Sequence, residues 1–222
     1  MNKSDLKLDW ASHKAALYAC KRWHYSKSIP KTKLFKVGVW EENEFKGVII
    51  FSRGASPFLF TKYALNQSDG CELTRIALKK HIFPISRMVS IAIKLLKDKN
   101  PGLKLIVSFA DEKQGHYGGI YQAGNWIYTG KSTEVRTWII GNSKKRWHER
   151  AIGLKFGTTM QSKIPNSKIV IDPGKHRYLM PLTKEMRERI LPLAKPYPKA
   201  CKVSDGFDQK HSGGLTPTCT LQ

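Results

Sequence analysis

Residues 71–111, CELTRIALKKHIFPISRMVSIAIKLLKDKNPGLKLIVSFAD, contain a strand, a helix and a second strand in succession. CELTRIAL (71–78) and LKLIVSFA (103–110) are short apolar runs of strand length. Between them lies a segment with helical spacing, for which we expect Ser86 as N-cap and Asn100-Pro101-Gly102 as the end. Its apolar face holds Met88, Val89, Ala92, Leu95 and Leu96. Two strands joined by a helix form a βαβ unit, so part of the sheet is predicted to be parallel.

Further elements are expected on both sides of this unit. They are a helix at 10–21, a hairpin formed by 33–40 and 45–54, a short helix at 116–123, strands at 126–130 and 134–141, a strand pair within 165–182 and a terminal helix within 183–195. This order of elements predicts an α/β (α+β) fold in which helices flank a mixed central sheet.

The composition favours a folded protein with a polyanionic partner. The chain has 222 residues, of which 41% are hydrophobic, and its 39 Lys and Arg exceed its 17 Asp and Glu, giving a formal net charge of +22. Such an excess favours nucleic acid, because each phosphate that a protein neutralises releases condensed counterions. The alternative is a basic surface that serves only solubility.

Cysteine usage and the apolar runs indicate the compartment. Cys20, Cys71, Cys201 and Cys219 form no C-x-x-C pair, so neither a zinc ribbon nor a disulfide framework is suggested. Reduced thiols fit a cytosolic protein. The N-terminal MNKSDLKLDW lacks the apolar segment of a signal peptide, and the longest apolar runs are too short to span a bilayer. We therefore expect a cytosolic protein without a membrane partner.

A basic and aromatic cluster follows Gly141. It consists of Lys144, Lys145, Arg146, Trp147, His148 and Arg150. Cations bind phosphates and aromatic rings stack on exposed bases, so this cluster is the expected DNA contact. A solvated charged face is the other interpretation.

SFADEKQGHYGGIYQAGNW, residues 108–126, places a carboxylate and several rings after an apolar strand. Asp111 ends that strand, where a carboxylate is costly unless it is paired or used. It either takes part in proton transfer or caps the next helix. Trp126 is expected to pack in the core, and His116 to lie on a surface loop.

The same segment resembles GNAT-type acyltransferases. The strand, the bend and YQAGNW are similar to the fifth strand, the fourth helix and the Y-x-x-x-G-F/W signature of those enzymes. The resemblance implies that Asp111 orients or deprotonates the acceptor amine. It places Tyr121 near the leaving group and Ser108 beside both of them.

The resemblance also extends to the strand-to-helix junction after CELTRIAL. There such enzymes hold the cofactor pyrophosphate on free backbone N–H groups. This implies donor binding by Ser86, Arg87 and Ser90, with Arg75 holding an anionic donor group. The usual Q/R-x-x-G-x-G/A loop is absent, and KKHIFPISR stands in its place. Glu72 and Arg75 are three apart on one strand, so we expect them on opposite faces.

Several motifs in order resemble the Mom DNA-modification proteins of Mu-like bacteriophages, over most of the chain up to about residue 200. They are KRWHYSKSIPKTK (21–33), ELTRIAL (72–78), SRMVS (86–90), SFADEKQGHYGGIYQAGNWIYTG (108–130) and KHRYLMPL (175–182). This resemblance implies conversion of adenine in double-stranded phage DNA to N6-carbamoylmethyladenine, with the base flipped out of the duplex. It implies protection from restriction, in the host bacterial cytoplasm.

The resemblance leaves the donor and a metal open. Acetyl-CoA with iron-assisted chemistry and a glycyl donor both fit. His24 and Tyr25, in WHYS, are candidates for a base, a metal ligand or a stacking ring, although such residues more often only pack. A metal, if present, would be held where His24, Asp111 and His116 converge.

The predicted organisation has three parts. Residues 1–141 form a GNAT-like catalytic core, residues 142–200 a basic extension that packs on the core and contacts DNA, and residues 201–222 a disordered tail. Two other function classes remain open. A conventional GNAT acetyltransferase acting on protein or RNA would share the fold, and a non-enzymatic DNA-binding protein would share the charge.

Overall fold

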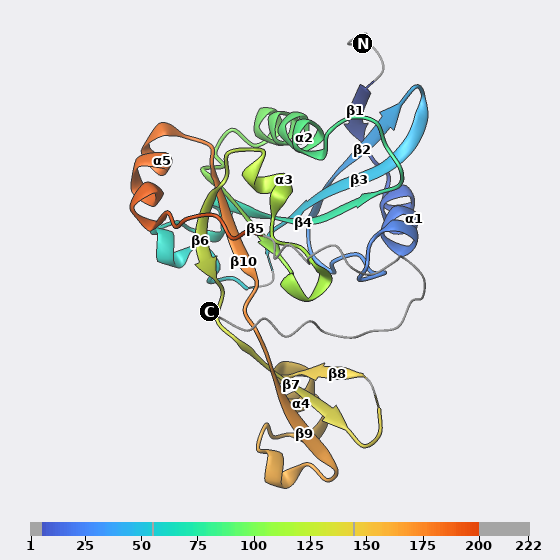
Figure 1. Ribbon diagram of the computed structural model, residues 1–222, viewed down its shortest axis with the longest axis vertical. Coiled ribbons are helices and arrows are strands. Elements are labelled where there is room, and N and C mark those ends of the chain that lie inside the picture. Colours follow the sequence, from blue (N-terminus) through green and yellow to red (C-terminus); the bar gives the residue numbers. More distant parts are fainter. Residues whose placement is uncertain (1–5, 55, 144, 200–222) are drawn as a thin grey trace, which may run out of the picture.

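The computed structural model describes residues 6–54, 56–143 and 145–199, which fold into two sheets of unequal size (Figure 1). The large sheet has seven strands in the order β1-β2-β3-β4-β5-β10-β6, and the small sheet has three in the order β8-β7-β9. The large-sheet strands are β1 (Leu6–Trp10), β2 (Leu34–Glu41), β3 (Glu44–Ser52), β4 (Gly70–Leu78), β5 (Leu105–Ala110), β10 (His176–Pro181) and β6 (Ile127–Lys131). The small sheet contains β8 (Arg146–His148), β7 (Val135–Ile140) and β9 (Ser167–Asp172).

Helices cover both faces of the large sheet. They are α1 (His13–Trp23), α2 (Ile85–Lys99), α3 (Gly119–Gln122) and α5 (Lys184–Ile190), while α4 (Glu149–Phe156) packs on the small sheet. The predicted class, a mixed sheet flanked by helices, is confirmed. So is the βαβ unit, because β4 and β5 pair in parallel from Gly70↔Leu105 to Leu73↔Ser108. The other strand pairs are antiparallel.

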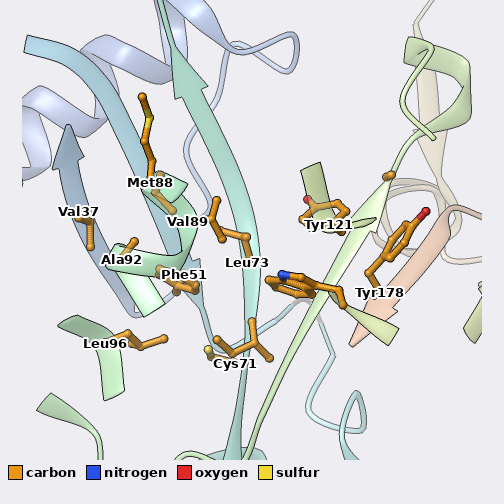
Figure 2. Close-up of a cluster of buried hydrophobic side chains, with 14 of the residues drawn as sticks. Val37, Phe51, Cys71, Leu73, Met88, Val89, Ala92, Leu96, Tyr121 and Tyr178 are labelled. Carbon is orange, nitrogen blue, oxygen red and sulfur yellow. The ribbon is translucent and has the colours of Figure 1, made fainter. Parts of the chain in front are cut away.

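The main core lies between α2 and the large sheet. Met88, Val89, Ala92 and Leu96 of α2 are buried against Val37, Phe51, Cys71 and Leu73 (Figure 2). Tyr121 of α3 and Tyr178 of β10 extend the same cluster across β5. On the other face α1 buries Ala16, Ala19 and Cys20 against Val48 and Ile50. Burial of this kind contributes roughly 1.5–3 kcal/mol for each large apolar side chain.

Two predicted boundaries near the N-terminus and at α2 are wrong. Leu6–Trp10 is an edge strand on β2, and the helix starts only at His13, capped by Ser12, whose Oγ accepts the Ala15 N–H at 3.1 Å. Helix α2 has Pro84 as its N-cap, so Ser86 lies inside the first turn. Proline fits here because its missing N–H is not needed at a helix start.

The predicted strand pair within residues 165–182 is also wrong. Both strands exist, but β9 pairs with β7 in the small sheet, whereas β10 lies between β5 and β6 in the large one. Pro173 and Gly174 therefore join two sheets rather than the arms of a hairpin.

Glu72 and Arg75 do not point to opposite faces. The register of β4 against β3 shifts between Ile50 and Phe51, and this bulge inserts an extra residue at Thr74. Such a bulge resets the alternation of side chains, so Glu72, Thr74 and Arg75 line one cavity together.

The small sheet hangs below the large one and is joined to it by two chain segments (Figure 1). The expected boundary between residues 141 and 142 falls inside this small sheet, between β7 and β8. Residues 176–190, expected in the extension, belong to the large sheet and to α5, which packs on it. The expected tail, 201–222, lies outside the described residues. Within the described part of the chain, no helix is long and apolar enough to cross a membrane.

Candidate active site

A cavity opens where the parallel strands β4 and β5 part. Their last paired residues are Leu73 and Ser108, but β4 continues to Leu78 and β5 to Ala110. Beyond that point lies a cavity of about 440 Å³. Its walls come from β4, the end of β5, the start of α2 and the loop from Gly115 to Tyr121, and Tyr25 closes one side. A volume of this order suits a small ligand.

A buried hydroxyl chain marks the inner end of this cavity. Ser108 Oγ lies 2.7 Å from the Leu73 carbonyl and 2.7 Å from the Tyr121 hydroxyl. The carbonyl can only accept, and Ser108 has one proton, so Tyr121 must donate to Ser108. Burial raises the pKa of Tyr121 to about 12, against the lowering effect of the Ser108 hydrogen bond. Tyr121 is therefore neutral at pH 7 and keeps an oxygen lone pair for an incoming N–H or O–H group.

Three rings lie together at the other side of the cavity. The Tyr25 ring stacks on His24 at 4.3 Å between centroids and meets His116 edge-on at 5.8 Å. Tyr25 and His116 line the cavity, whereas His24 is buried behind Tyr25. Tyr25 is half exposed and so provides a flat, accessible ring.

His24 is held as a neutral imidazole with a defined tautomer. Its Nδ1 accepts the Ser26 backbone N–H at 3.1 Å, which leaves the ring proton on Nε2. Burial first, and then the electrostatic effect of the neighbouring Arg75, His116 and Lys175, together lower the pKa of His24 to about 4. In this state His24 is a hydrogen-bond donor through Nε2.

Asp111 lies one residue beyond the cavity wall. Its Oδ1 accepts the Lys113 backbone N–H at 3.2 Å, which caps the short 3-10 helix Glu112–Gln114, and its Oδ2 pairs with Lys175 Nζ at 2.9 Å. The preceding residue, Ala110, lines the cavity, but Asp111 does not. Asp111 caps the turn before the expected helix, so its catalytic role stays a prediction.

The predicted donor-binding residues are divided between two cavities. Arg75 lines the first, with its Nε donating to the Ser28 carbonyl at 3.2 Å. Ser86, Arg87 and Ser90 instead line a second cavity of about 450 Å³ between α2 and α3. Ile85 borders the first cavity, and Ile120 borders both, so the two cavities are neighbours at the start of α2.

The metal candidates are not gathered into a site. Asp111 is engaged by Lys175 and Lys113, and the rings of His24 and His116 are separated by Tyr25. In the part of the chain that the structure describes, no group of three His, Cys, Asp or Glu residues is placed to hold a metal ion. The described residues therefore do not fit an iron site.

The predicted DNA-binding cluster lies in the small sheet and α4. Trp147 packs with Trp138, Ile152 and Ile164, and the Lys145 ammonium lies 4.1 Å from its ring centroid. Arg146 pairs with Asp172, and Arg150 is exposed on α4. Lys144 lies outside the described residues.

Three features of the cavity wall were not predicted. Tyr117 lines the cavity, and its carbonyl accepts the Tyr178 hydroxyl at 2.5 Å. Gly118 has φ +84°, and a Cβ there would lie 2.3 Å from the Tyr178 ring. The GG pair in the sequence was a signal for such a close approach. Phe109 also lines the cavity, although its place on the strand resembled that of a core residue.

Residues 5–199 match the model of the Mom protein family. The chain is also 26% identical over 191 residues to a protein of Escherichia phage Mu named methylcarbamoylase mom, an alignment that covers 79% of this chain and 76% of that protein. The family match spans both sheets and every wall of the two cavities. This chain therefore belongs to the Mom protein family.

Proposed function

We propose that this chain is a phage DNA-modifying enzyme that converts adenine to N6-carbamoylmethyladenine and so protects DNA from host restriction enzymes. The observation that carries the proposal is the cavity where β4 and β5 part, in a chain of the Mom family whose phage Mu relative is named a methylcarbamoylase. The reaction takes place on double-stranded DNA in the host bacterial cytoplasm.

The cavity serves as the pocket for a flipped adenine. Adenine N6 is out of reach inside a duplex, and extruding the base costs a few kcal/mol. The half-exposed Tyr25 ring, supported from behind by His24, offers a stacking surface for that base. Stacking on an aromatic side chain contributes about 1–3 kcal/mol, which offsets much of the cost.

The cavity also offers groups for the N6 protons. The Tyr121 oxygen has a free lone pair because its proton is donated to Ser108. Asp111, one residue past the wall, is the proposed acceptor for the proton that N6 must lose. In the product N6 is bonded to a CH2 carbon, so the new bond forms either at an α-carbon or by a rearrangement after transfer of a glycyl group.

The second cavity is the proposed donor site. Ser86, Arg87 and Ser90 surround it at the N-terminal end of α2, where partial positive charge and the Arg87 guanidinium favour an anionic group. Arg75 lies on the first cavity, where it can hold the transferred portion. Acetyl-CoA and a glycyl donor are the two candidate donors.

Nucleoside mass spectrometry of DNA from a bacterial host that expresses the chain tests the proposal. The expected result is an adenosine heavier by one carbamoylmethyl substituent, together with DNA that resists restriction. A Tyr121→Phe chain serves as the control, since it removes the hydroxyl and keeps the ring. Unmodified DNA with modified RNA or protein would indicate a conventional acetyltransferase. Unmodified nucleic acid and protein, with tight DNA binding, would indicate a DNA-binding protein without enzymatic activity.

A further inference from the structure

The small sheet has one covered face and one open face. Trp138, Trp147 and Ile169 occupy paired positions on three strands and pack with Ile152 of α4. Side chains alternate along a strand, so the residues between them point to the opposite face. Within the described residues, α4 and the turn Gln161–Lys163 pack on the first face. On the other face, called the open face here, Thr137 is buried and Asp172 meets Lys113, whereas the strands at the two edges carry exposed side chains.

The open face carries two cross-strand rows. In one row, Ile139 of β7 lies between Arg146 of β8 and Lys168 of β9. In the next row, Thr137 lies between His148 and Val170. Arg146, Lys168 and His148 are all exposed at the two sides of these rows. The result is a surface with cations along both edges.

Asp172 connects this face to the candidate active site. Its carboxylate pairs with Arg146 of β8 and also with Lys113, which belongs to the loop before the cavity wall. The Thr137 hydroxyl donates to its other oxygen at 3.1 Å. Burial alone would raise the pKa of Asp172, but Lys113 and Arg146 outweigh that effect and lower it. One carboxylate thus serves two cations, and the surface keeps a net positive charge.

The cations of the covered face contact an aromatic ring rather than a carboxylate. The ammonium groups of Lys145 and Lys155 lie 4.1 and 4.8 Å from the Trp147 ring centroid. A cation placed over an indole is attracted by the ring, and it loses that attraction when it turns to a phosphate. The side with α4 also exposes Leu154, which is 84% accessible and unsuited to a phosphate backbone.

We propose that duplex DNA binds on the open face of the small sheet, with Arg146 and Lys168 on phosphates, and that the face with α4 points away from it. This inference rests on the proposed function and narrows it to one surface. The position of Lys113 between this face and the cavity supports the placement of the DNA. DNA on the open face meets Lys113 and so reaches the loop that leads into the adenine pocket. A phosphate displaces Asp172 from Arg146, while Lys113 continues to neutralise Asp172.

Two matched double variants test the inference. Arg146→Gln with Lys168→Gln removes two charges from the open face, and Lys145→Gln with Lys155→Gln removes two from the covered face. Affinity for a fluorescent duplex is measured by anisotropy over a range of salt concentrations, and thermal melting checks that each variant is folded. The slope of log K against log salt should become shallower by about 1.8 in the open-face variant, since each lost phosphate contact removes about 0.9. The covered-face variant should keep the wild-type slope.

A third variant should change the affinity for duplex DNA in the opposite direction. Asp172→Asn removes the carboxylate that competes with phosphate, so this variant should bind duplex DNA more tightly than wild type. Equal slopes in the two double variants, or a loss confined to the covered face, would overturn the inference. The proposed function is judged separately by the modified nucleoside, so a wild-type enzyme that modifies DNA survives either outcome. If the arginine double variant melts early, Lys168→Gln alone replaces it, with an expected change of about 0.9.

Discussion

Asp111 has two structural partners that bear on its role. Asparagine caps a helix start as well as aspartate does, so Asp111→Asn keeps the hydrogen bond from Lys113 and loses the ion pair with Lys175. If Asp111 accepts the N6 proton, modification should fall by roughly two to four orders of magnitude while DNA affinity survives. The measurement is the initial rate of adenine modification by purified protein.

Lys175→Met is the matched control for that variant. It breaks the same ion pair and leaves the carboxylate in place. A catalytic Asp111 predicts that Lys175→Met keeps most of its activity. If both variants lose activity to the same extent, Asp111 acts as an anchor for the loop and has no part in proton transfer.

His24 makes stability depend on pH. In the unfolded chain it takes up a proton near pH 6.5, whereas in the folded chain burial keeps it neutral down to about pH 4. The unfolded state binds more protons in this window, so the free energy of unfolding falls as pH drops from 6.5 towards 4. His24→Asn keeps an acceptor near Nδ1 and does not titrate.

Urea denaturation at several pH values measures this effect. The free energy of unfolding should change with pH more steeply in the wild type than in His24→Asn. The difference should reach about 1.4 kcal/mol per pH unit, the value for one proton. His176, whose pKa burial also lowers, is present in both proteins and cancels in the comparison. Parallel curves would mean that the pKa of His24 is the same in the folded and the unfolded chain.

At the scale of elements, the loop before α3 depends on one glycine. Gly118 has φ +84°, and a Cβ on it would overlap the Tyr178 ring, which holds the loop through the Tyr117 carbonyl. Gly118→Ala should lower the free energy of unfolding by about 1–3 kcal/mol and reduce activity, because the cavity wall must shift. Urea denaturation and the modification rate measure the two effects.

The adjacent glycine provides the control. Nothing lies within 4 Å of a Cβ placed on Gly119, the first residue of α3. Gly119→Ala should therefore be tolerated or slightly stabilising. Equal destabilisation by the two substitutions would show that helix formation, rather than contact with Tyr178, decides the outcome.

Elements with a strong local pattern could be predicted from the sequence. The helix between two apolar strands led directly to the parallel pair of β4 and β5, and with it to the place where they part. The strand Leu6–Trp10 was not predicted, and the helix was expected to begin at residue 10, because the edge pairing of this strand with β2 is a tertiary contact. The bulge at Thr74 and the separation of β9 from β10 also depend on partners far along the chain, which periodicity does not register.

Some residues of the candidate site could also be identified from the sequence. Tyr25, Arg75, His116 and Tyr121 do meet at one cavity, although they come from separate parts of the chain. The family motifs pointed to Tyr25, Arg75 and Tyr121, since residue types alone do not distinguish a packing tyrosine from a lining one, whereas His116 was expected on a surface loop; the roles of all four stay predictions. The position of Asp111 just outside the wall depends on Lys175, a partner 64 positions later that no local signal identifies.

At the scale of the whole molecule, three consecutive residues hold the two sheets in relation to each other. Asp111 pairs with Lys175, Glu112 with Lys131 at 2.5 Å, and Lys113 with Asp172. Lys131 ends β6, Asp172 ends β9 and Lys175 lies between β9 and β10, so the partners lie in or next to the two segments that join the small sheet to the large one. These segments also bond to each other, with the Ser132 N–H donating to the Lys175 carbonyl at 2.8 Å. A single exposed ion pair contributes about 0–1 kcal/mol, but these three act on one loop.

Neutralising two of these residues should loosen the connection between the two sheets, called the joint here. Glu112→Gln with Lys113→Gln keeps side-chain shape, and the distance distribution between spin labels on α2 and α4 should broaden. Cys201 and Cys219 are changed to Ser for labelling. Lys184→Gln with Glu188→Gln, an ion pair within α5, is the control and should leave the distribution unchanged. An unbroadened distribution in the first variant would mean that backbone contacts alone fix the joint.

The place of β10 between β5 and β6 has a consequence for synthesis on the ribosome. The β5 edge, with its run Leu105–Ala110, stays without its antiparallel neighbour until residues 176–181 have left the exit tunnel. At about 5–20 residues per second that delay lasts several seconds, during which an apolar strand edge is open to wrong partners. The small sheet and α4 are built only from residues between β6 and β10 in the chain. They can therefore fold during the delay and bring β10 to its position between β5 and β6. A nascent chain stalled before residue 176 should consequently depend on chaperones, and one released after residue 199 should not.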